Sequence, residues 1–230
     1  MGEYFTPDFF RFLGDLSKNN NRDWFATNKP RYEKAVQAPS LRFIRDVGPR
    51  LQKITRHLVA DPKPFGGSLM RIYRDVRFSK DKSPYRTTVG IHVPHAFGKK
   101  LGAHTPGLWL HLEPGDSFAA SGVWQPDSSI LRRIRDAIVT RPDDWKAVLR
   151  MRPSLEGESL KRPPTGYDPG HPFIVDLMRK DFVASVPFRD TDITRDDFME
   201  RFLEAGVAMD PLNRFLANAM DLPWQAATIR

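Results

Sequence analysis

Proline is the feature of this sequence that most limits how the chain can fold. It occupies 20 of 230 positions, nearly twice the usual share of about 5%. Proline lacks the amide hydrogen that a helix interior needs and that a central strand uses in its ladder. Long uninterrupted helices and coiled coils are therefore excluded. The chain also contains no cysteine, so disulfides, thiolate metal sites and a cysteine nucleophile are excluded.

Helical periodicity is strongest towards the two ends of the chain. Thr6-Pro7-Asp8 has the residue types of a helix start, and short helical pieces broken at Pro30 follow it. In the second half, Asp127 is suited to cap a helix. Apolar spacing of three and four residues predicts helices at 7–17, at about 40–58 with a kink or an interruption near Gly48-Pro49, from Asp127, from 143–145, and at about 172–179, 194–208 and 211–221.

The middle of the chain has the alternation that is typical of β-strands. Enrichment in β-forming residues predicts a strand at 68–76, and we expect further strands at 87–93, 108–112 and 117–124 and an extended piece at 182–188. Short turns between the first four predict an antiparallel meander. Helices, then strands, then helices indicate an α+β fold with a central antiparallel sheet of about four or more strands. No repeat or long polar linker divides the chain, so we expect a single domain over 1–230.

The positive charge is concentrated in one part of the chain. The formal net charge is +8, yet residues 41–100 alone hold 14 basic and 4 acidic side chains. Such an excess favours an anionic partner, although a solvated basic surface is the alternative. No run of 18 apolar residues occurs and the first residues do not resemble a secretory signal. We therefore expect a cytoplasmic protein without a membrane partner.

Residues 71–87 interleave cations with aromatic residues. Guanidinium and ammonium groups in this density suit a phosphate or a carboxylate, so our leading hypothesis is the binding of an anionic, phosphate-bearing small molecule. The predicted ligand-binding residues are Arg71, Tyr73, Arg74, Arg77, Lys80, Lys82, Tyr85 and Arg86.

Two alternatives remain for the same block. Asp75 and Asp81 are suited to pair with the arginines, which would make the block a structural salt-bridge network at a hairpin turn. Nucleic-acid binding is the other alternative, and it predicts affinity that falls steeply with salt. No helix-turn-helix, RNA-binding or zinc-finger signature supports it.

Histidines offer a different chemistry, that of an enzyme. His92 and His111 lie on neighbouring predicted strands, and His111 and Glu113 would share one strand face. His95 and His104 lie in the loop between those strands. His92, His111 and Glu113 are therefore weak catalytic candidates beside the basic block. No metal-binding spacing or phosphate loop is present, so we predict no metal and no cofactor.

Several blocks of the sequence resemble a known family. The block Arg71–Thr87 is the most specific, and Ser121-Gly122-Val123-Trp124-Gln125-Pro126, Gly166-Tyr167 and His171-Pro172 follow in the same order. These blocks are similar to the bacterial family known as domain of unknown function 2461, over about residues 4–222. The resemblance implies a soluble bacterial α+β domain and carries no activity or catalytic residue with it.

Overall fold

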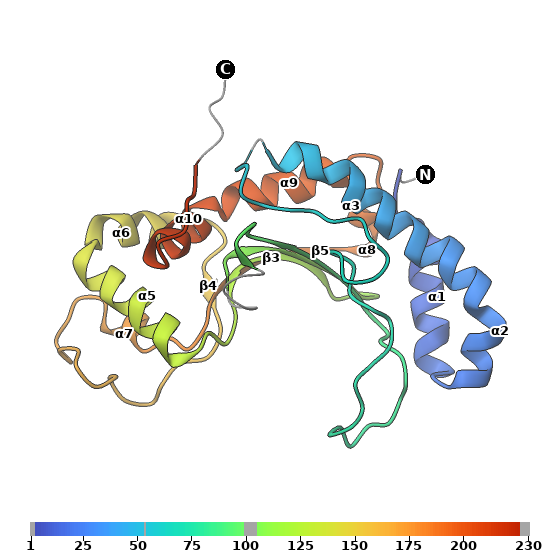
Figure 1. Ribbon diagram of the computed structural model, residues 1–230, viewed down its shortest axis with the longest axis horizontal. Helices are drawn as coiled ribbons and strands as arrows, with labels where there is room; N and C mark the ends of the chain where they lie inside the picture. Colours follow the sequence, from blue (N-terminus) through green and yellow to red (C-terminus); the bar gives the residue numbers. More distant parts are fainter. Residues whose placement is uncertain (1–2, 53, 99–104, 226–230) are drawn as a thin grey trace.

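The computed structural model describes residues 3–52, 54–98 and 105–225, and these form an arch (Figure 1). A curved sheet lies in the middle of the arch, with helices over its convex side and at both ends. The fold is α+β and consists of one domain, as the sequence predicted.

The sheet is antiparallel throughout, with the strand order β1-β2-β3-β5-β4. The predicted strands at 87–93, 108–112 and 117–124 and the extended piece at 182–188 all form. The two-residue strand β4 was not predicted, because it lies in a proline- and glycine-rich loop without alternation. The strands are β1 (Val89–Pro94), β2 (Gly107–Leu112), β3 (Ser117–Val123), β4 (Leu155–Glu156) and β5 (Phe182–Phe188).

The strand predicted at 68–76 is wrong. The chain follows β1 only briefly, where the Met70 amide donates to the Gly90 carbonyl at 2.9 Å and Leu69 bridges Ile91. Beyond Met70 it leaves the sheet and makes a separate bridge between Tyr73 and Tyr85. Enrichment in β-forming residues could not show that this segment leaves the sheet and pairs with residues 84–86 instead.

The N-terminal helices differ from prediction at two prolines. Helix α2 runs through Pro30 and continues directly into a π-helical turn, so the predicted break is absent. Helix α3 ends at Leu51, just after Pro49, whereas the predicted helix continued to residue 58. The elements are α1 (Pro7–Lys18), α2 (Arg22–Tyr32), η1 (Glu33–Gln37) and α3 (Ala38–Leu51).

The helices after β3 agree more closely with the sequence. The Asp127 carboxylate accepts from the amides of Ser129 and Ile130, each at 2.9 Å, which confirms the predicted cap. The helix predicted at about 194–208 forms as α9 but begins only at Phe198, and α8 lies just before the predicted range. The elements are α5 (Ser128–Thr140), α6 (Pro142–Arg150), α7 (Ile174–Leu177), α8 (Asp190–Ile193), α9 (Phe198–Ala208) and α10 (Asp210–Ala219).

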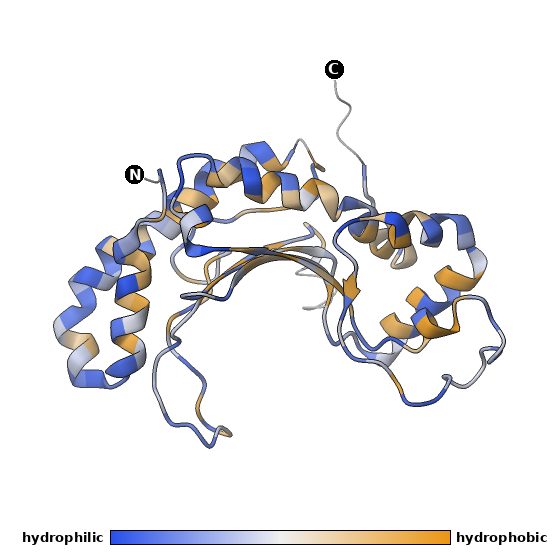
Figure 2. Ribbon diagram, turned by 180° about the vertical axis from the view of Figure 1, so that it is seen from behind, coloured by the Kyte–Doolittle hydropathy of each residue, from blue (hydrophilic) through white to orange (hydrophobic). Residues whose placement is uncertain are grey.

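One face of the sheet forms the core. Leu108, Leu110 and Leu112 of β2 are buried on this face, and α9 and α10 pack against it. Gly206 of α9 allows a close approach, since a Cβ atom there would lie 2.9 Å from Ile54 Cδ1. Figure 2 shows hydrophobic residues in the strands and on the helix sides that face them. None of the described helices combines the length and the apolar character that crossing a bilayer requires.

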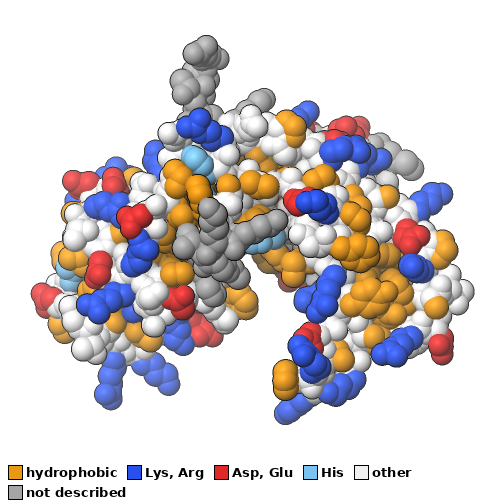
Figure 3. Space-filling view, in the orientation of Figure 1, with side chains coloured by type: hydrophobic (Ala, Val, Ile, Leu, Met, Phe, Trp, Pro, Cys, Tyr) orange, Lys and Arg blue, Asp and Glu red, His pale blue; other side chains and the backbone are white. Residues whose placement is uncertain are grey.

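The other face of the sheet lines the hollow of the arch that Figure 3 shows from one side. Its side chains include the half-buried His92, Trp109, His111 and Phe118. Burial of only one face explains why the strands alternate so clearly in the sequence.

A pair of glycine substitutions tests the close packing of α9. Gly14 of α1 has no atom within 4 Å of an added Cβ, so Gly14→Ala should raise the free energy of unfolding by about 0.5–1 kcal/mol. Gly206→Ala should lack that gain. Gly206→Leu should lower the free energy of unfolding by about 1–3 kcal/mol, because the larger side chain overpacks the contact with the sheet. Urea denaturation measures all three. Equal gains from the two alanine variants would contradict close packing of α9 on the sheet.

Candidate functional site

The basic block of the sequence forms an arm that stands out from the arch. We define the basic arm as residues 71–87; Figure 1 shows it as the green hairpin that extends below the sheet. Its two segments are joined by the Arg86 amide, which donates to the Ile72 carbonyl at 2.7 Å, and by the Arg74 amide, which donates to the Pro84 carbonyl at 2.9 Å. The arm is therefore a narrow two-segment ribbon.

The base of the arm is fixed to the N-terminal helices. The Asn20 side chain donates to the Tyr85 carbonyl at 2.9 Å and accepts from the Tyr85 amide at 3.1 Å. The Tyr85 ring stacks on Phe25, with ring centroids 4.0 Å apart. Tyr85 is 6% exposed as a result, so its ring packs in the core at the base of the arm and is not open to a ligand. Tyr73, by contrast, is 49% exposed.

Two of the six cations in the arm are neutralised within it. Arg77 forms a forked pair with Asp75, with Nη2 to Oδ2 at 2.6 Å and Nε to Oδ1 at 3.0 Å. Arg74 pairs with Asp81. Hydrogen bonds from Arg77 lower the pKa of Asp75, and hydrogen bonds from Ser83, then Arg74, lower the pKa of Asp81. The salt-bridge network that the sequence left as an alternative is thus formed.

The other four cations have no such counter-charge. Arg71, Lys80, Lys82 and Arg86 make no ion pair within 4.0 Å in the part of the chain that the structure describes, and all four are exposed. Lys82 donates instead to the Val76 carbonyl at 3.0 Å. Local pairing therefore accounts for only part of the positive charge.

The eight predicted ligand-binding residues do not gather in one place. Arg74, Tyr85 and Arg86 line a cavity at the base of the arm, which we name the base cavity. Arg71 and Tyr73 line a second cavity, which we name the aromatic cavity. Arg77, Lys80 and Lys82 line neither of these cavities and lie towards the end of the arm.

The base cavity has a volume of about 370 Å³ and a polar lining. The hydroxyls of Ser17, Thr87 and Thr88 have no hydrogen-bond partner among the described residues. Asn20 is occupied by the Tyr85 backbone, and Ser83 donates to Asp81 at 2.6 Å. The lining residues are Ser17, Asn20, Arg74, Asp81, Ser83, Tyr85, Arg86, Thr87 and Thr88.

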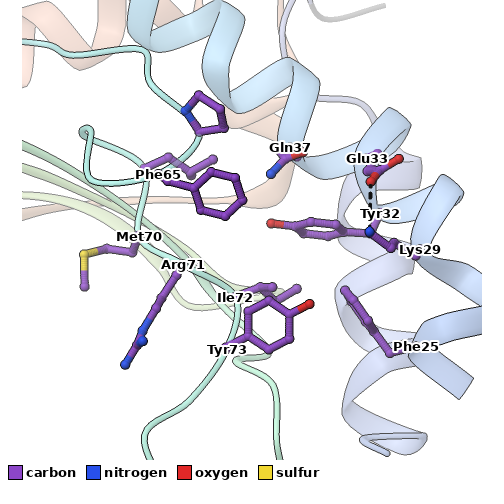
Figure 4. Close-up of a pocket in the computed structure, with 12 residues that line it drawn as sticks. Phe25, Lys29, Tyr32, Glu33, Gln37, Phe65, Met70, Arg71, Ile72 and Tyr73 are labelled. Carbon is purple, nitrogen blue, oxygen red and sulfur yellow. Dashed lines mark ion pairs between the residues drawn. The ribbon is translucent and has the colours of Figure 1, made fainter. Parts of the chain in front are cut away.

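The aromatic cavity, of about 290 Å³, lies between the start of the arm and the helices α2 and η1. Figure 4 shows the rings of Phe65, Tyr32 and Tyr73 around it, with Arg71 directed away from those rings. Lys29 and Glu33 form an ion pair at 3.7 Å on its helical side. Burial raises the pKa of Tyr32 to about 12, so its hydroxyl stays protonated at neutral pH.

The catalytic candidates on the sheet are brought partly together. His111 Nε2 lies 3.0 Å from Glu113 Oε2, and the His111 ring stacks on Phe118 at 4.8 Å. His92 shares their face but lies beside Trp109, and burial lowers its pKa. Arg71 lies outside the sheet, in the arm, so the structure does not place it with these side chains on one sheet face.

The loop histidines add nothing to that group. His95 is buried and its Nε2 is 2.9 Å from the Pro223 carbonyl oxygen, while His104 lies outside the described residues. Among the described residues, no three His, Asp or Glu side chains are placed to hold a metal ion.

Sequence reasoning missed the part of the base cavity that comes from the N-terminal helices. Ser17 and Asn20 lie at the end of α1 and in the turn after it, and Asn20 is 65 residues from its partner Tyr85 in the arm. In the sequence, the run Lys18-Asn19-Asn20-Asn21 has the composition of a turn. No local signal connects that turn with the arm, because their contact is tertiary.

Comparison with known proteins finds one matching family, and the description of that family names no activity. The family described as "Conserved hypothetical protein (DUF2461)" matches residues 8–215. No curated protein and no solved structure matches the chain.

The anchoring of the arm by Asn20 can be tested with its neighbour as the control. Asn20→Ala removes both hydrogen bonds to the Tyr85 backbone and should lower the free energy of unfolding by about 1–3 kcal/mol. Amide hydrogen exchange should rise at Arg74 and Arg86 more than in β2. Asn19→Ala removes only an exposed bond to the Asp15 carbonyl and should leave the arm protected. Unchanged exchange in the arm of Asn20→Ala would contradict the anchoring role.

Proposed function

The chain belongs to the DUF2461 family, and we propose that it binds a phosphate-bearing small molecule in the base cavity. One observation supports the proposal: Arg86, which has no ion pair among the described residues, lines the cavity together with Ser17, Thr87 and Thr88. This set is smaller than the eight residues that the sequence suggested, and it includes three side chains that the sequence did not suggest.

The chemistry of these donors favours phosphate. A guanidinium presents a planar fork of N–H groups that matches two oxygens of a phosphate. Hydroxyl groups donate to the remaining oxygens and do not add charge. The unpaired donors at the base cavity therefore suit a tetrahedral oxyanion better than an apolar or a cationic ligand.

Asp81 is the one carboxylate in the cavity lining, and its charge is already compensated. It accepts from Ser83 and pairs with Arg74. The lining thus has two cations and one anion, which leaves a net charge of +1. Arg74 acts in this arrangement by neutralising Asp81, whereas Arg86 is the cation that meets the ligand.

The size of the cavity limits the ligand. A volume of about 370 Å³ lies at the lower end of the range for small-molecule sites, about 300–1,000 Å³. A sugar phosphate or the phosphate end of a nucleotide is consistent with it. Lys80 and Lys82 lie outside the cavity and would contribute a long-range attraction for anions.

Thermal shift with defined phosphates tests this function. A ligand present at about 100 times its dissociation constant should stabilise the protein by about 2.7 kcal/mol, which corresponds to about 5–11 °C in Tm. Inorganic phosphate, pyrophosphate, sugar phosphates and nucleotides are the probes. Arg86→Ala should abolish the shift, and Arg86→Lys should restore only part of it because an ammonium cannot form the forked contact.

The matched control is Arg56→Ala, since Arg56 is an exposed arginine that lines neither cavity. It should keep the full shift. If none of the phosphates raises Tm, or if Arg86→Ala responds like the unaltered protein, the base cavity is not a phosphate site and the ion pairs of the arm serve only its shape.

A further inference from the structure

The end of the basic arm carries an apolar side chain that nothing in the described structure covers. Phe78 is 96% exposed, the largest value among the exposed hydrophobic residues. Phenylalanine is usually buried, and its exposure at the end of a projecting hairpin indicates a contact made outside the chain. The Arg77 guanidinium lies over its ring, 5.9 Å from the centroid.

The backbone at the end of the arm is held in place by the arm itself. Lys82 Nζ donates to the Val76 carbonyl at 3.0 Å, and the forked pair of Arg77 with Asp75 fixes the preceding turn. Phe78 is thus presented by a closed loop and not by a free chain end. Ordering this loop would add little to the entropic cost of binding.

The cations of the arm lie on both of its segments. Arg71, Arg74 and Arg77 belong to the outgoing segment, and Lys80, Lys82 and Arg86 belong to the returning one. A ribbon of two extended segments fits the major groove of B-form DNA, which is about 12 Å wide. Phosphates line both sides of that groove, so cations along both edges of a ribbon are complementary to it.

We propose that the basic arm docks in a groove of double-stranded DNA, with its cations against the phosphates and Phe78 against the base pairs. Apolar side chains at the end of a basic element contact base edges or wedge between base steps in other DNA complexes. The arm has room to enter a groove, since Figures 1 and 2 both show it extending beyond the sheet on the side away from α3 and α9.

Other polyanions fit the arm less well. Double-helical RNA has a major groove that is too narrow and deep for side chains to read. An anionic membrane would receive Phe78 together with its polar neighbours Ser79, Lys80 and Asp81, and a single aromatic residue is a weak anchor. In Figure 3 the end of the arm is mainly blue, with little hydrophobic surface.

The two proposals share Arg86, but Phe78 and Lys80 line neither cavity. Variants at the end of the arm therefore test DNA docking without altering the base cavity. Since both side chains are exposed, their removal should leave the free energy of unfolding unchanged.

Fluorescence anisotropy with a labelled duplex of about 25 base pairs, titrated from 50 to 200 mM salt, is the test. Four cations without ion pairs should give a slope of log K against log salt of about −3.6, which is a loss of affinity on the order of 100-fold over this range. Lys80→Ala should make the slope shallower by about 0.9. Phe78→Ala should weaken binding about tenfold with an unchanged slope, because it removes an uncharged contact.

Two control variants distinguish DNA binding by the arm from nonspecific electrostatic or hydrophobic binding elsewhere on the surface. Arg56→Ala removes an exposed arginine away from the arm, and Val175→Ala removes a side chain of α7 that is 69% exposed; both should bind like the unaltered protein. The proposal is overturned if the duplex does not bind at 50 mM salt, if Phe78→Ala binds as tightly as Val175→Ala, or if single strands or anionic vesicles bind more tightly than the duplex.

Discussion

Burial of one face of the antiparallel sheet is the constraint on which the rest of the structure depends. The strands alternate, so the leucines of β2 must be covered while Trp109 and His111 point to the opposite side. Helices α9 and α10 supply the cover, and Phe43 of α3 packs against Phe198 and Phe202 of α9. The N-terminal helices are thereby fixed relative to the sheet, and the base of the arm is fixed with them.

The arm shows how a chain can keep a high density of like charge. Asp75 and Asp81 neutralise the two arginines that lie closest to them in the hairpin, which reduces repulsion where the segments are close together. The cations without a counter-charge are exposed to water, where screening makes their mutual repulsion small. Surface ion pairs contribute little to the free energy of unfolding. We therefore expect the paired arginines mainly to define the conformation of the hairpin, and the unpaired cations to attract anionic ligands.

The residues of the basic block are divided among the base cavity, the aromatic cavity and the end of the arm, and this division changes the functional interpretation of the block. A single ligand site with eight residues would need all of them around one volume, whereas the structure divides them between two cavities and the end of the arm. A small phosphate ligand at the base and a DNA duplex along the arm use different residues, except for Arg86. Both proposals therefore follow from where the charge lies and not from its total amount.

The sequence by itself determined the α+β class, the Asp127 cap, most strands and the existence of a basic hairpin, because each of these depends on residues close together in the chain. The break at Pro30 and the strand at 68–76 were wrong because tertiary packing overrode a local preference. Only the tertiary structure decided that Asn20 meets Tyr85 across 65 residues, that the Tyr85 ring is buried, and that Ser17 joins Arg86 in one cavity. Such contacts form when separate faces are buried together, and no local pattern in the sequence records which faces will meet.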